Sequence, residues 1–186
     1  MANVLTDPPF AADPPVKFNV NAKILGLVLG ILALIGAILS LLGLIAVFGL
    51  CTIYGQTING CGIPILALLG SLLQVAAFIL AAVGGFRMYQ MNREGKVNFI
   101  YGLALGALGT VVYLVGNIIF WGGISVTGAA GVGGAVVGVI IDLIFIFIFY
   151  YLVVISRFPG EAPLVPSAYG GGYGGYGSPP PPPPPA

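Results

Sequence analysis

The sequence predicts an all-α integral membrane protein, an antiparallel bundle of four transmembrane helices with disordered cytoplasmic termini. Three observations carry this prediction. Hydrophobic residues make up 59% of the 186 residues and charged residues only 6%, against roughly 25% charged residues in a soluble domain. Four apolar runs are each long enough to cross a bilayer. All six Lys and Arg residues flank these runs on one side of the predicted membrane.

The four apolar runs define the predicted domain organisation. A spanning helix needs roughly 18–20 apolar residues, and each run reaches this length. The predicted spans are residues 24–50, 62–86, 99–121 and 129–155. They form a transmembrane domain, 23–157, which follows a proline-rich segment, 1–22, and precedes a tail, 158–186.

The distribution of charge predicts the orientation of the chain. Lys and Arg residues lie before the first span, between the second and third spans, and after the fourth. The segments 51–61 and 122–128 contain no charged residue. Because Lys and Arg are in excess in cytoplasmic loops, both termini are expected in the cytoplasm.

Small residues recur along each predicted span at spacings of three and four. Lipid removes most of the hydrophobic drive for helix association, so membrane helices pack through close contact between small residues. Three GxxxG pairs mark the predicted helix-packing positions: Gly26 and Gly30, Gly102 and Gly106, and Gly134 and Gly138. The pattern predicts a compact bundle that also associates laterally, as a homo-oligomer or as a subunit of a membrane complex.

Asp142 is the least expected residue of the fourth span. A carboxylate at the bilayer centre costs roughly 2.5–3.5 kcal/mol and marks a candidate functional site. No Lys, Arg or His lies within any predicted span, so the chain offers this carboxyl group no cationic partner. It is either a structural hydrogen-bonding group, within the bundle or at a subunit contact, or a proton or cation site. The predicted polar layer at mid-membrane comprises Asp142, Gln74, Thr110, Tyr113 and Ser40.

Cys51 and Cys61 bracket the predicted first outer loop. They are the only cysteines and lie on the predicted non-cytoplasmic side, where disulfides persist. A disulfide between them is expected to join the first two spans, and two free cysteines are the alternative. No metal site is expected, because no further ligands accompany them.

The tail is expected to be disordered, because its Gly/Tyr-rich stretch, 167–178, cannot bury enough surface to fold. Seven prolines follow and are expected to form a polyproline II rod. Such a rod docks into cytoplasmic proline-binding modules, and a low-complexity spacer is the alternative. These residues are Pro179, Pro180, Pro181, Pro182, Pro183, Pro184 and Pro185.

Four spans, cytosolic termini, short outer loops and a Tyr/Gly/Pro-rich tail together resemble the MARVEL-type four-span membrane proteins. The physin and gyrin relatives have tails of similar composition, although the first outer loop here, 51–61, is shorter than in physins. The resemblance implies a non-enzymatic role in organising membrane or vesicle contacts.

The sequence therefore predicts a structural or scaffolding membrane protein rather than an enzyme. No nucleophile–base pair, cofactor-binding loop or metal constellation is present, so no cofactor is expected. A net charge of +1 predicts no nucleic-acid partner. The expected partners are the lipid bilayer, other membrane proteins or copies of the chain, and a proline-binding module. Two alternatives stay open: an oligomeric channel or proton- or cation-conducting subunit that uses Asp142, and an accessory subunit of a larger membrane complex.

Overall fold

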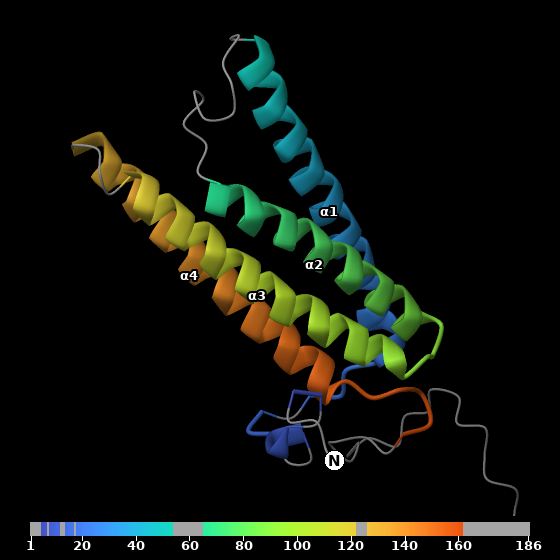
Figure 1. Ribbon diagram of the computed structural model, residues 1–186. Coiled ribbons are helices and arrows are strands. Elements are labelled where there is room, and N and C mark those ends of the chain that lie inside the picture. The colour runs from blue at the N-terminus through green and yellow to red at the C-terminus, as the bar shows by residue number, and fades with distance from the viewer. Residues whose placement is uncertain are drawn as a thin grey trace, which may run out of the picture.

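The computed structural model describes residues 5–6, 8–11, 14–16, 18–53, 65–121 and 126–161. Four long helices make up most of this part of the chain (Figure 1): α1 spans Ala22–Ile53, α2 Ile65–Tyr89, α3 Glu94–Trp121 and α4 Val126–Ile155. A 3-10 helix, η1, covers Pro9–Ala11. Each long helix contains a stretch that is long and apolar enough to cross a membrane. The chain is therefore an all-helical, multi-pass membrane protein, as the sequence predicts.

Three helices, α1, α3 and α4, begin earlier than their apolar runs, and asparagine side chains cap two of them, α1 and α3. α3 begins at Glu94, before the predicted start at residue 99, and the Glu94 N–H donates to Asn92 Oδ1 at 2.9 Å. At the start of α1, the Lys23 N–H donates to Asn21 Oδ1, also at 2.9 Å. An N-cap oxygen satisfies one of the free N–H groups of the first turn. Hydropathy alone does not detect such polar starts.

The short connection between α2 and α3 is a tight turn without a glycine at its critical position. The Asn92 N–H donates to Arg87 O at 2.9 Å, and the Met91 N–H donates to Met88 O at 3.0 Å. These are the two hydrogen bonds of a Schellman motif, whose left-handed residue is usually glycine. Here Met91 occupies it, with φ 65°. The sequence therefore contains no glycine that would predict the end of α2.

The helices pack in chain order: α1 on α2, α2 on α3, and α3 on α4. α1 leans away from α2 toward the end at which α1 finishes (Figure 1). All four helices contribute to an apolar core at the opposite end, where α1 and α3 begin and α2 and α4 end. Its larger members are Leu29, Met88, Phe99, Ile100 and Val153. The helices are therefore held together most extensively at this end.

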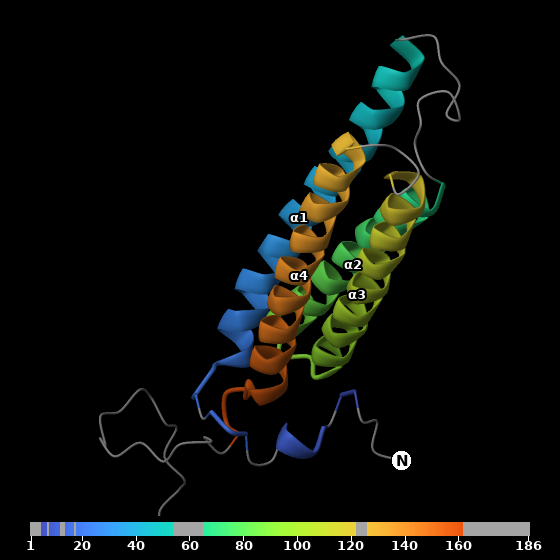
Figure 2. The ribbon, with the colours of Figure 1, turned by 90° about the vertical axis from the view of Figure 1, so that its left-hand side faces the viewer.

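The same end joins the beginning and the end of the helical domain (Figure 2). The Ala22 N–H donates to Arg157 O at 2.8 Å, and the Arg157 N–H donates to Val20 O at 2.9 Å. We call it the basic end, because it holds every Lys and Arg of the described residues: Lys23, Arg87, Arg93, Lys96 and Arg157.

Glycines bring helix backbones into direct contact at the α1–α2 and α2–α3 interfaces. A Cβ atom added to Gly85 of α2 would lie 2.5 Å from the Cα atom of Gly30 and 2.7 Å from the carbonyl oxygen of Gly26. On α3, a Cβ atom added to Gly102 would lie 2.8 Å from the backbone nitrogen of Ala81. At these positions glycine is required by the approach of the neighbouring helix, because any side chain would collide with backbone.

The other predicted packing glycines do not bring helix backbones into direct contact. A Cβ atom added to Gly106 would make an ordinary contact, 3.6 Å from the Cβ atom of Ala77. Around Gly134 and Gly138 of α4, no described atom lies within 4 Å of the corresponding position. The close helix packing expected at these two glycines is therefore not found among the described residues, because both glycines line a cavity.

The predicted disulfide and tail concern residues outside the described part of the chain. Cys51 belongs to α1, but Cys61 is not among the described residues. The Gly/Tyr-rich stretch and the prolines at 179–185 are not among them either. The disulfide and the polyproline rod stay predictions.

Candidate functional site

A chain of three polar side chains crosses from α2 through α3 to α4 near the middle of the spans. Gln74 Nε2 donates to Thr110 Oγ1 at 3.1 Å, and Thr110 Oγ1 donates to Asp142 Oδ2 at 2.8 Å. Both hydrogen bonds are donated toward the carboxyl group, which is the final acceptor of the chain. The structure thus brings together three of the five residues of the predicted polar layer.

The three residues differ in their access to the surroundings. Thr110 is 2% exposed, Gln74 is partly buried and Asp142 is exposed. Of the two structural positions expected for Asp142, within the bundle or at a subunit contact, its exposure in the single chain fits the second. Asp142 is exposed because α4 packs mainly on α3 and α1 mainly on α2, so one side of α4 has no described helix packed closely on it.

Two cavities meet at this polar chain, and together we call them the Asp142 groove. The cavity nearer the basic end has a volume of about 220 Å³ and is mainly apolar, with Phe78, Phe145 and Phe149 in its wall. The other cavity has a volume of about 450 Å³ and is lined in part by Gly134 and Gly138. Gln74, Thr110 and Asp142 line both cavities. The groove therefore combines apolar walls with one carboxyl group.

Of the two remaining residues of the predicted layer, Tyr113 lies in the groove and Ser40 lies outside it. Tyr113 lines the larger cavity, as does Asn117, whose Nδ2 donates to Tyr113 O at 2.8 Å. Sequence analysis did not single out Asn117, although it lies two helical turns after Thr110 and so on the same face of α3. Ser40 belongs to α1 and lines neither cavity. Its depth in the first span was a poor guide, because depth does not tell which helices are neighbours.

No positive charge of the described residues balances Asp142. The Lys and Arg residues lie at the basic end, and Arg157, just beyond α4, is roughly 22 Å away at a rise of 1.5 Å per residue. A mid-membrane carboxylate costs about 2.5–3.5 kcal/mol, whereas an interhelical hydrogen bond in a membrane protein returns about 0.6 kcal/mol on average. The hydrogen bond from Thr110 therefore offsets only part of the cost. No cluster of three or more His, Cys, Asp or Glu residues that could hold a metal lies in the described ranges.

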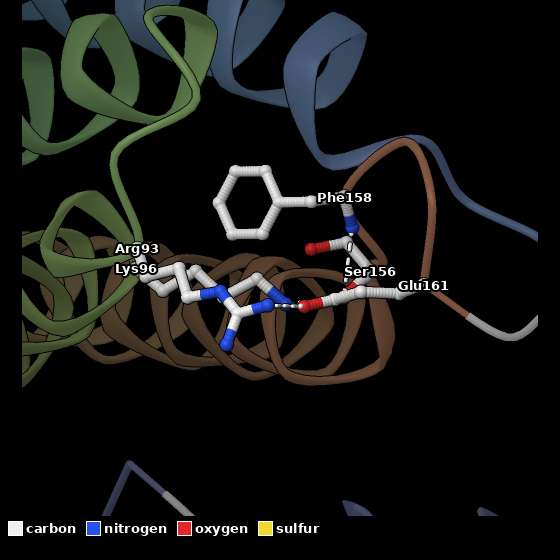
Figure 3. A network of polar contacts seen from close by, with 5 residues as sticks. All are labelled: Arg93, Lys96, Ser156, Phe158 and Glu161. Carbon is white, nitrogen blue, oxygen red and sulfur yellow. Dashed lines mark hydrogen bonds and ion pairs between the residues drawn. The ribbon is translucent and has the colours of Figure 1, made fainter.

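A second polar cluster, the α4 clasp, lies at the basic end and consists of Arg93, Lys96, Ser156, Phe158 and Glu161 (Figure 3). Lys96 Nζ donates to Ser156 O just after α4 and lies 5.3 Å from the centroid of the Phe158 ring. Arg93 Nη2 is 3.0 Å from Glu161 Oε1, and the Phe158 N–H donates to Glu161 Oε2 at 2.9 Å. The start of α3 thus holds the segment that follows α4. Sequence analysis missed this cluster, because its two halves are distant in the chain.

The proline-rich segment also contacts the end of α4. The Phe10 ring stacks on Tyr151, with ring centroids 5.9 Å apart. Tyr150 Oη donates to Leu5 O at 2.9 Å, and Arg157 Nη2 donates to Ala11 O at 3.2 Å. Figures 1 and 2 show this segment lying across the basic end of the helices.

Comparison of the chain with known protein families, with curated proteins and with solved structures finds no match. The fold and the groove therefore define its class on their own: an all-helical, multi-pass membrane protein with a carboxyl group in an open groove between helices. The resemblance to MARVEL-type proteins stays a prediction.

Proposed function

We propose that this protein is a non-enzymatic membrane scaffold that associates laterally with other membrane proteins through the open side of α4. The exposed carboxyl group of Asp142 in the groove carries this proposal. A helix from another chain that packs there would remove this group from lipid, where it is costly. Gly134 and Gly138 leave room for such a helix, since nothing described lies within 4 Å of an added Cβ atom.

The contacts and charges support an antiparallel bundle with both termini in the cytoplasm. Gly26 lies against Met88 and Gly36 against Phe78, so residue numbers rise along α1 as they fall along α2. The basic end holds the start of α1 and the residues after α4, and the positive-inside rule assigns such an end to the cytoplasm. There the predicted polyproline tail would meet proline-binding modules. Staining of terminal epitope tags on intact, unpermeabilised cells would contradict this orientation.

Replacing Gly138 with leucine is expected to disrupt lateral association while leaving the fold intact. The new side chain would fill part of the larger cavity and keep another helix away, but it would meet no described atom of its own chain at the Cβ position. Native mass spectrometry after extraction in mild detergent would show the loss of higher-mass complexes.

The matched control for this variant is Val137→Leu. Val137 is the neighbouring residue, is 57% exposed and does not line the groove. The Val137→Leu substitution adds apolar bulk to the same helix and should leave the complexes unchanged. Equal masses for the Gly138→Leu protein and the unmodified protein would contradict lateral association through this side of α4.

A proton- or cation-conducting subunit is the alternative that the polar chain favours, because Gln74, Thr110 and Asp142 line both cavities at mid-span. Intramembrane acids commonly mark ion pathways. A cation flux into proteoliposomes that the Asp142→Asn variant loses would establish this alternative. An accessory subunit of a larger complex would use the same groove, but with one fixed partner at constant stoichiometry.

A further inference from the structure

We propose that the partner of the Asp142 groove is a transmembrane helix that carries a Lys or Arg residue at the middle of its span. This inference rests on the proposed lateral association and specifies the chemistry of the partner. Its starting point is the charge of the groove. Among the described residues, every Lys and Arg lies at the basic end, far from Asp142 along the helices.

The hydrogen-bond chain uses one oxygen of the Asp142 carboxyl group and leaves the other able to accept a further hydrogen bond. Gln74 donates to Thr110, and Thr110 donates to Oδ2 of Asp142. No described residue donates to the second oxygen, Oδ1, and the side chain is exposed to the groove. A Lys ammonium or an Arg guanidinium offers only donors, and it forms charge-assisted hydrogen bonds with a carboxylate. The attraction between such a cation and a carboxylate is stronger in the low dielectric of a membrane than in water.

The shape of the groove suits a helix. Its lining residues on α4 run from Gly134 to Phe149, a length of roughly 22 Å, or about four helical turns. Gly134 and Gly138 permit a close approach at one end, where another helix can pack as tightly as α2 packs on α3. Phe145 and Phe149 offer an apolar wall at the other end. Asp142 lies between these two stretches, so the matching cation belongs near the middle of the bound helix.

The charge of the groove argues against a second copy of this chain as the partner. A two-fold contact brings the same surface of both copies together, so packing through this side of α4 would place two Asp142 carboxyl groups near each other. Two carboxylates at close range repel each other, most strongly in a low dielectric. The four spans contain no Lys or Arg that a second copy could offer at this depth. A different chain with a basic residue at mid-span complements the groove.

The test uses the full-length protein in phosphatidylcholine vesicles with synthetic Leu/Ala transmembrane peptides as probes. One peptide carries a central Lys and the matched peptide carries Leu at that position. Energy transfer between labelled protein and labelled peptide measures their association. We expect the Lys peptide to associate at least about tenfold more tightly than the Leu peptide. The near-isosteric Asp142→Asn variant should lose this preference, and Asp142→Lys should instead prefer a peptide with a central Asp.

The outcomes separate this inference from the proposed function. Equal association of the Lys and Leu peptides with the unmodified protein would overturn the cationic partner and leave lateral association standing. Energy transfer between copies of the protein that excludes the Lys peptide would identify a second copy as the occupant and also overturn it. No association with either peptide or with another copy would count against lateral association itself. Circular dichroism of the two Asp142 variants confirms that they are folded before comparison.

Discussion

Replacing Gly85 with alanine is expected to destabilise the helix bundle by about 1–3 kcal/mol, the usual cost of forcing extra atoms into a packed core. The added Cβ atom would lie 2.5 Å from the Gly30 Cα atom and 2.7 Å from the Gly26 carbonyl oxygen. Both obstacles are backbone atoms of α1 and cannot rotate away. The clash is relieved only if α1 and α2 separate, and their separation also opens neighbouring contacts. Unfolding in detergent micelles with increasing dodecyl sulfate, followed by circular dichroism, measures the loss.

The Gly43→Ala variant is the control for this experiment. Gly43 lies within α1, and nothing described lies within 4 Å of an added Cβ atom. Both variants make the same change of helix propensity, which favours alanine by about 1 kcal/mol in water. Gly43→Ala should therefore leave the stability unchanged or slightly raise it. Equal stabilities for the two variants would show that backbone contact does not hold α1 against α2.

Replacing Lys96 with methionine is expected to release the end of α4 from the start of α3. Methionine keeps the apolar stem of the side chain but loses the charged donor to Ser156 O and the cation beside the Phe158 ring. A hydrogen bond to a charged group contributes about 1.5–3 kcal/mol, and a cation near a helix C-terminus adds typically 0.3–1 kcal/mol. Hydrogen–deuterium exchange measured by mass spectrometry should show faster exchange across residues 156–161.

Arg87→Met provides the matched control, since it also removes a positive charge at the basic end. Arg87 Nη1 lies 3.8 Å from Glu94 Oε2, and the two side chains are 46% and 76% exposed. Exposed ion pairs typically contribute about 0–1 kcal/mol. This variant should therefore leave exchange across 156–161 unchanged. Similar exchange in both variants would mean that net charge, rather than the α4 clasp, holds this segment.

The helices were predictable from the sequence because a span is recognised from the mean hydropathy of about twenty residues, which a single polar residue changes little. Their ends were less predictable, because single side chains decide them. Asn92 begins α3 before its apolar run, and Met91 adopts a left-handed conformation that normally indicates glycine.

The sequence predicted those features of the candidate site that depend only on how deep each residue lies in its span. Gln74, Thr110 and Asp142 each lie near the middle of a span, and the structure joins them by hydrogen bonds. Ser40 has a comparable depth but belongs to α1, which lines neither cavity. The GxxxG pattern has the same limit: it indicates that a helix approaches closely, but not whether that helix belongs to the same chain. Gly30 meets Gly85 of its own chain, whereas Gly138 meets no described atom.

The bonds of Val20 and Ala22 to Arg157 bring the entry and the exit of the transmembrane domain to one point. Anything attached to the segment before α1 is thus tethered beside anything attached to the segment after α4. Two bulky proteins that bound these segments would compete for the same space, so occupation of one segment would discourage occupation of the other. A single protein that recognises both segments gains instead from effective concentration, because its second contact becomes intramolecular. A ligand able to contact both segments would therefore have an advantage over two ligands that each contact one.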